Sequence, residues 1–250
     1  MAGHSHSANI ARRKGAVDAK RGQIFSKLAR AIISAARTGG GDVETNLKLK
    51  YALEKARAAN MSKDTIERAL QRGTGSKEGD AFEELVYEGY APGGVALLVT
   101  CLTDNRNRTA PDIKYIFDRG NGNLGSPGSV SFLFELRSQL VIEREGRDED
   151  ALTELALEVG ADDVELDGEA AVLTGSPNEF IALKRALEER GAKFLSAELA
   201  YVPQSRVPVV SQDDARRVLR LIETLEANDD VQSVYANYDM PTEWLDELAG

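Results

Sequence analysis

Residues 140–202 read LVIEREGRDEDALTELALEVGADDVELDGEAAVLTGSPNEFIALKRALEERGAKFLSAELAYV, and this stretch decides the fold of the chain. The spacing of its apolar residues predicts alternating strands and helices. The predicted elements are a strand at 140–143, a helix at 151–159, strands near 164–166 and 170–173, a helix that starts at 177, and a strand at 193–202. Asp167-Gly168 is typical of a tight hairpin, and Ser176-Pro177-Asn178-Glu179 has the pattern of a capping box. The order βαββαβ is that of the ferredoxin-like fold.

The segments on either side of this unit are incomplete domains. Before it lie predicted strands at 85–90, 95–102 and 129–136, with a helix that carries Ile113, Ile116 and Phe117 and is capped by Asp104 or Thr109. After it lie a helix that starts at Ser211 and a strand near 231–238. A single helix–strand pair cannot cover its own apolar face. We therefore expect the two flanks to form one α+β domain into which the ferredoxin-like unit is inserted.

The N-terminal part of the chain is predicted to be helical. Apolar residues between 18 and 38 form one stripe at helical spacing, namely Phe25, Leu28, Ala29, Ile32, Ile33 and Ala36. Gly39-Gly40-Gly41 ends this helix. Two further helices are expected at 46–59 and 63–72, the second capped by Ser62. Three helices with short links predict a small bundle.

The expected fold class is α+β, with an N-terminal three-helix domain followed by two α+β domains, the third ferredoxin-like and inserted into the second. The expected divisions are 1–78 for the basic arm and helical domain, 79–136 and 204–240 for the split α+β domain, 137–203 for the inserted domain, and 241–250 for the C-terminal tail. Trp244 in the tail is expected to pack against the body.

Charge divides sharply along the chain. The first 38 residues contain eight basic side chains and a single acidic one, Asp18, although the protein has a formal net charge of −10. Such a basic segment on an acidic body is typical of a protein that binds a polyanion, most commonly nucleic acid. The predicted nucleic-acid-binding residues are Arg12, Arg13, Lys14, Lys20, Arg21, Lys27, Arg30 and Arg37. Those on the helix lie opposite its apolar stripe, so we expect a solvated face of one sign.

Composition excludes several classes of protein. No apolar run approaches the length of a transmembrane span, and the N-terminus lacks the apolar segment of a secretory signal. Cys101 is the only cysteine and lies in an apolar run, so a buried side chain is expected rather than a reactive thiol. These features lead us to expect a cytoplasmic, monomeric protein that does not bind membranes.

Enzymatic function is not expected. Gly120–Gly128 is glycine-rich, but no GK[ST] follows it, so it does not have the pattern of a phosphate-binding P-loop. Asp104 and Asp112 could hold a metal, but they are better explained as caps and as ion-pair partners of Arg106 and Arg108. His4 and His6 make a poor metal site without a third ligand. We expect no metal, no cofactor and no small-molecule substrate.

Several motifs resemble those of the YebC family over essentially the whole chain. The matching motifs are Met1–Ser5, Asp18–Gly22, Ala35–Arg37, Asn60-Met61, Asp64–Ala69, Arg72-Gly73, Tyr87–Tyr90, Gly93-Gly94, Thr103–Thr109 and Gly122–Gly125. This chain departs from the family pattern at His6-Ser7, where the family has Lys-Trp, at Ala11-Arg12, where it has Lys-His, and at Ser62, where it has proline. Loss of a tryptophan and a lysine removes a stacking ring and a charge from the arm.

The resemblance implies the same three-domain fold and no enzymatic activity. Members of the family are described as DNA-binding transcriptional regulators, whereas the mitochondrial member is a translational activator and bacterial relatives are linked to translation. The leading hypothesis is a DNA-binding regulator of transcription. The alternative is a translation factor that binds ribosomal RNA, because no predicted helix exposes a face rich in base-reading side chains. A scaffold that acts through its acidic body is a further alternative.

Overall fold

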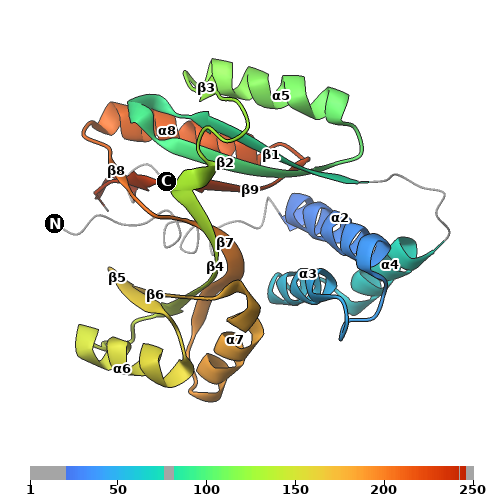
Figure 1. The fold of residues 1–250 in the computed structure, drawn as a ribbon, viewed down its shortest axis with the longest axis vertical. Coiled ribbons are helices and arrows are strands. Elements are labelled where there is room, and N and C mark those ends of the chain that lie inside the picture. The colour runs from blue at the N-terminus through green and yellow to red at the C-terminus, as the bar shows by residue number, and fades with distance from the viewer. Residues whose placement is uncertain (1–20, 76–81, 242, 246–250) are drawn as a thin grey trace.

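The computed structural model describes residues 21–75, 82–241 and 243–245, which form three domains (Figure 1). The helical domain consists of α2 (Arg21–Gly39), α3 (Leu47–Ala58) and α4 (Lys63–Thr74). The side chains of Asn46 and Ser62 cap α3 and α4 by accepting hydrogen bonds from the amides of Leu49 and Thr65. The predicted cap at Ser62 is thus confirmed. The domain has its own core, which includes Ile32, Ile33, Leu49, Leu53 and Ala69.

Close packing of α2 against α4 depends on Gly73. A Cβ atom at this position would lie 2.7 Å from the Cβ of Ala36 and 2.8 Å from the carbonyl oxygen of Ile33. The missing side chain therefore allows the two helices to touch backbone to backbone.

The central domain is an antiparallel sheet with helices on one face. Its strands are β1 (Glu83–Tyr90), β2 (Ala96–Thr103), β3 (Asn123–Leu124) and β9 (Val231–Ala236), in the order β3-β1-β2-β9. Helices α5 (Arg106–Arg119) and α8 (Gln212–Glu226) both pack on the same face (Figure 1). Trp244 packs against this core, as expected. The short strands β8 (Val207–Pro208) and β10 (Tyr238–Asp239) pair in parallel beside it.

The inserted domain has the predicted ferredoxin-like order. It consists of β4 (Phe134–Glu143), α6 (Glu149–Val159), β5 (Asp163–Asp167), β6 (Ala170–Gly175), α7 (Phe180–Glu189) and β7 (Phe194–Pro203). The sheet order is β5-β6-β4-β7, and both helices cover one of its faces (Figure 1). The hairpin at Asp167-Gly168 is confirmed, with Gly168 at a φ of 62°. The segments before and after the insert meet in the central sheet, where β2 pairs with β9.

The connection between these two domains differs from the prediction. The sequence predicted separate strands ending at Leu136 and beginning at Leu140, but β4 is continuous and pairs with β7 along its length. The polar residues Arg137, Ser138 and Gln139 hid this continuity, because they interrupt the apolar pattern. Phe134 packs in a cluster with central-domain residues, whereas Leu140 packs with α6 and α7. The chain therefore passes from one domain to the other within a strand.

Three local predictions are corrected. Asn105, not Asp104 or Thr109, caps α5 by accepting a hydrogen bond from the amide of Arg108 at 3.2 Å. Ser176 does not form a capping box; a 3-10 turn at Pro177–Glu179 precedes α7, and the Ser176 carbonyl accepts a hydrogen bond from Ser138 Oγ. The glycine-rich segment contains the short strand β3, whose close approach to β1 requires the absence of a side chain at Gly89.

Candidate nucleic-acid interface

The eight predicted nucleic-acid-binding residues fall into two groups. Arg12, Arg13, Lys14 and Lys20 lie outside the described residues, as does the side chain of Arg21. The other three, Lys27, Arg30 and Arg37, lie on α2. Arg37 is half-buried in the last turn of that helix. The structure therefore positions only the helical part of the predicted site.

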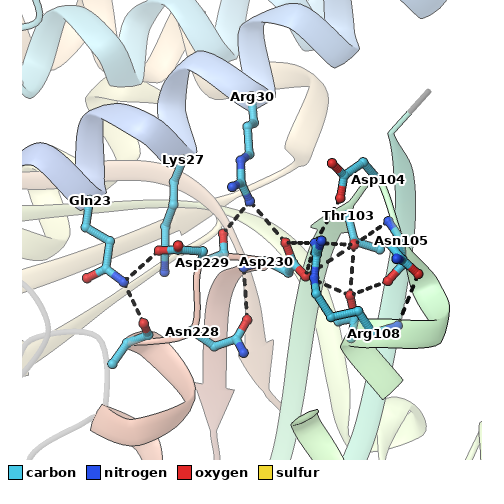
Figure 2. Close-up of polar contacts among 12 residues, drawn as sticks. Gln23, Lys27, Arg30, Thr103, Asp104, Asn105, Arg108, Asn228, Asp229 and Asp230 are labelled. Atoms are coloured by element: carbon cyan, nitrogen blue, oxygen red, sulfur yellow. Dashed lines mark hydrogen bonds and ion pairs between the residues drawn. The ribbon is translucent and has the colours of Figure 1, made fainter. Parts of the chain in front are cut away.

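Lys27 and Arg30 point toward the central domain (Figure 2). Lys27 Nζ donates a hydrogen bond to the carbonyl oxygen of Glu226 at 2.6 Å. Arg30 Nη1 donates to the carbonyl oxygen of Asp229 at 2.9 Å and to Asp230 Oδ1 at 3.1 Å. The prediction of a solvated basic face is wrong at these two positions, and their role in binding phosphate stays a prediction.

Gln23 extends the same contact by one helical turn. Its Nε2 donates to the carbonyl oxygen of Ala227 at 2.5 Å and to Asp229 Oδ1 at 3.2 Å. Gln23, Lys27 and Arg30 lie at positions i, i+4 and i+7, which face the same side of a helix. We call this set of contacts with residues 226–230 the α2–α8 contact.

The α2–α8 contact has a simple electrostatic basis. The last carbonyls of a helix have no partners within it, and they carry the negative end of the helix dipole. Here they accept hydrogen bonds from the cationic and amide side chains of α2 at the end of α8. Burial lowers the pKa of Lys27, although the nearby charges of Glu226 and Asp229 oppose this shift. The lysine is therefore held in a partly desolvated anionic environment.

Asp230 connects this contact to the core of the central domain. Its side chain is only 5% exposed and accepts hydrogen bonds from Arg108 Nη2 at 2.9 Å, Thr109 Oγ1 at 2.8 Å and Thr103 Oγ1 at 3.2 Å. Burial alone would raise the pKa of Asp230, but the hydrogen bonds and the charge of Arg108 outweigh it, and the pKa is lowered. Arg30 and Arg108 thus share one ionised carboxylate.

Arg108 has the structural role that its sequence context suggested. It also pairs with Asp104 at 2.8 Å, and its hydrogen bonds to Asp230 and Asp104 raise its pKa. Sequence reasoning expected such an ion pair but missed Asp230 as the main partner. It also missed Gln23, Thr103 and Thr109, because no local pattern connects residues so far apart in the chain.

Other basic side chains of the helical domain pair with the protein's own carboxylates. The ion pairs are Lys48–Glu84 at 3.0 Å, Lys50–Glu44 at 3.8 Å, Lys55–Glu198 at 2.8 Å, Arg57–Glu54 at 3.0 Å and Lys63–Glu67 at 3.8 Å. Those of Lys48 and Lys55 reach into the central and inserted domains. These ion pairs partly neutralise the positive potential of the helical domain.

The glycine-rich loop already binds an anion from its own chain. The amides of Gly128, Val130 and Ser131 each donate to the carboxylate of Glu88 at 2.7 Å. Burial would raise the pKa of Glu88, but these three amides lower it. The Gly128 amide at the end of the glycine-rich loop and the amides of Val130 and Ser131 just after it are therefore engaged in a structural contact.

Two other kinds of site can be examined in the part of the chain that the structure describes, namely a reactive thiol and a metal site. Cys101 is 3% exposed, as expected, and burial raises its pKa to about 12. Over residues 21–75, 82–241 and 243–245, there is no group of three or more His, Cys, Asp or Glu side chains that could hold a metal. His4 and His6 lie outside these ranges. None of the helices in these ranges is long and apolar enough to cross a membrane.

These features define a three-domain α+β protein, whose helical domain contacts the central domain through polar groups. Comparison with known proteins then identifies the family. Residues 5–76 match the model of the TACO1/YebC protein N-terminal domain, and residues 82–238 match that of the TACO1/YebC second and third domain. The chain therefore belongs to the TACO1/YebC family.

Individual relatives agree with this assignment. The chain is 52% identical over 252 residues to a "Probable transcriptional regulatory protein" of Rubrobacter xylanophilus, with all of both chains covered. It is 49% identical over 250 residues to a protein of the same name from Dictyoglomus turgidum, again with full coverage. The crystal structure of a conserved hypothetical protein from Aquifex aeolicus matches with a TM-score of 0.81 and 44% identity, covering 91% of this chain and 93% of that one.

Proposed function

We propose that this protein is a non-enzymatic, DNA-binding regulator of transcription that grips the sugar–phosphate backbone through its N-terminal arm and helical domain. Its relatives are named transcriptional regulatory proteins, which supports a role in gene regulation. The observation that carries the proposal is the charge asymmetry. Eight basic side chains precede residue 39 in a chain of net charge −10. In this proposal the protein acts as a cytoplasmic monomer without a cofactor or small-molecule substrate.

Backbone recognition is favoured over base reading. A recognition helix presents Arg, Asn or Gln to base edges from one exposed face. On the described helices of the N-terminal domain, Lys27, Lys55 and Arg57 instead contact carboxylates or carbonyl groups of the chain itself. The arm residues Arg12, Arg13 and Lys14 are then the main phosphate-binding groups in this proposal.

The test is a binding measurement with a matched control. Arg12, Arg13 and Lys14 are replaced together by alanine, and affinity for a fluorescent DNA duplex of mixed sequence is measured by anisotropy over a salt series. We expect weaker binding and a salt slope shallower by about 0.9 per lost contact. The control replaces Arg185, Arg216 and Arg220, three exposed residues of α7 and α8, by alanine. The charge change is the same, so equal effects of both variants would contradict a specific role of the arm.

The second candidate function is translational regulation through ribosomal RNA. The same observation favours it, because an arm that binds backbones without reading bases suits RNA as well as DNA. Cosedimentation with ribosomes that survives DNase treatment would support this function. A footprint on promoter DNA at near-physiological salt would support transcriptional regulation instead.

A further inference from the structure

The helical domain is attached to the rest of the protein without a shared apolar core. In the described residues, its hydrophobic cluster contains only side chains from Phe25 to Phe82 and includes none from the sheets of the other two domains, strand β1 onward. Its contacts with the central domain include the α2–α8 contact and the exposed ion pair between Lys48 and Glu84. Polar interfaces of this kind allow domains to move relative to one another.

A second contact attaches helix α3 of the helical domain to the inserted domain. Tyr51 of α3 packs edge-on against Phe180 with ring centroids 5.3 Å apart, and its hydroxyl donates to the carbonyl oxygen of Pro177. Glu54 pairs with Lys184 at 2.9 Å. This contact joins α3 to the inserted domain and is independent of α2. It can serve as a pivot if the α2–α8 contact opens.

The groups bound by α2 resemble a nucleic-acid backbone in charge. The end of α8 contributes carbonyl oxygens and the negative end of its dipole, and Asp229 and Asp230 add two carboxylates. Lys27 Nζ and Arg30 Nη1 already donate to these groups in the free protein. Residues 226–230 therefore compete with a phosphate backbone for the donors of Lys27 and Arg30.

We propose that the α2–α8 contact is autoinhibitory: residues 226–230 occupy the basic face of α2 in the free protein, and a nucleic-acid backbone displaces them and swings the helical domain away from the central domain. This inference rests on the proposed function and adds a conformational step to it. Competition follows because both ligands are anionic and use the same donors of Lys27 and Arg30. A dense row of phosphates, already held by other contacts, is the stronger competitor.

A charge-neutral variant tests the competition. Gln23→Ala removes two hydrogen bonds of the α2–α8 contact without changing the charge of the protein. Weakening the closed state raises the fraction of open molecules, so affinity for the DNA duplex should increase about two- to tenfold. The control is Gln71→Ala, which removes an exposed glutamine from α4 and should leave affinity unchanged. Unchanged or weaker binding by Gln23→Ala would overturn the proposal.

A distance measurement tests the movement itself. Spin labels are placed on the full-length protein at Gln71→Cys in α4 and Asn107→Cys in α5, two exposed positions on either side of the contact. The native Cys101 is buried and does not compete for the label. The control pair, Asn107→Cys with Leu157→Cys, lies entirely within the central and inserted domains.

The outcomes separate the two proposals. Saturating DNA duplex should shift the Gln71–Asn107 distances to longer values and leave the control pair unchanged. If DNA binds at saturation but the first distance does not change, the autoinhibitory contact is overturned and the proposed function stands. If no nucleic acid binds, the proposed function fails and this inference fails with it.

Discussion

Arg30 and Asp230 are 200 positions apart in the sequence, yet Arg30 Nη1 lies 3.1 Å from Asp230 Oδ1 (Figure 2). Asp230 belongs to the core of the central domain through Thr103, Thr109 and Arg108. One carboxylate thus supports the fold of the central domain and holds the helical domain.

Replacement of the shared carboxylate should destabilise the central domain. Asp230→Asn removes the charge while keeping the shape, and it places an amide among donors that require an acceptor. We expect a loss of about 2–3 kcal/mol in the free energy of unfolding, measured by urea denaturation. Asp229→Asn is the matched control, because its side chain is exposed and accepts a hydrogen bond from Gln23 at the surface, and it should change stability by less than about 0.5 kcal/mol. Equal losses in both variants would contradict this account of Asp230.

The buried Glu88 should stabilise the glycine-rich loop. Glu88→Gln replaces a carboxylate that accepts three amide hydrogen bonds by a group with a single acceptor oxygen. We expect a loss of about 1.5–3 kcal/mol in the free energy of unfolding. The control is Glu84→Gln on the same strand, whose side chain is 63% exposed and pairs with Lys48. That change should cost less than about 1 kcal/mol.

Stability should also depend on the ionisation of these two carboxylates. The folded-state pKa values of Glu88 and Asp230 are both lowered, so their contribution is fully present above the unfolded-state pKa values of about 4. It is lost as pH falls through the folded-state values. The stability difference between the wild type and Glu88→Gln should therefore be constant near neutral pH and shrink in acid. A difference that is independent of pH down to pH 2 or so would contradict the linkage.

Two glycines of the helical domain should respond oppositely to substitution. Gly73→Ala places a methyl group against Ala36 and Ile33, so we expect a loss of about 1–3 kcal/mol from overpacking. Gly22→Ala in α2 meets no atom within 4 Å and should stabilise the helix by about 0.5–1 kcal/mol. Thermal unfolding of both variants measures the two effects. A higher melting temperature for Gly73→Ala would contradict the close packing of α2 against α4 at this position.

Most of the fold could be predicted because its signals are local. The apolar periods of α2, α6 and α8, the cap at Ser62 and the Asp167-Gly168 turn all lie within a few residues of the elements they define. The continuity of β4 was missed because Ser138 and Gln139 are buried polar residues whose partners lie elsewhere in the chain.

Less of the candidate site could be predicted from the sequence. The charge of α2 could be read directly, but its partners Glu226, Asp229 and Asp230 are brought to it only by tertiary structure. A basic helical face has the same sequence pattern whether it contacts solvent, phosphate or the end of another helix. Only the arrangement of domains distinguishes these cases.

The most direct test of the central claim is the salt dependence of DNA binding by the unmodified protein. Affinity for a mixed-sequence duplex should fall with rising salt, and the logarithm of the binding constant should decrease by about 0.9 for each phosphate contact per decade of salt. Contacts from all eight predicted basic residues would give a slope of about −7. A slope near zero, or no binding at low salt, would contradict the claim that a cationic N-terminal segment grips nucleic acid.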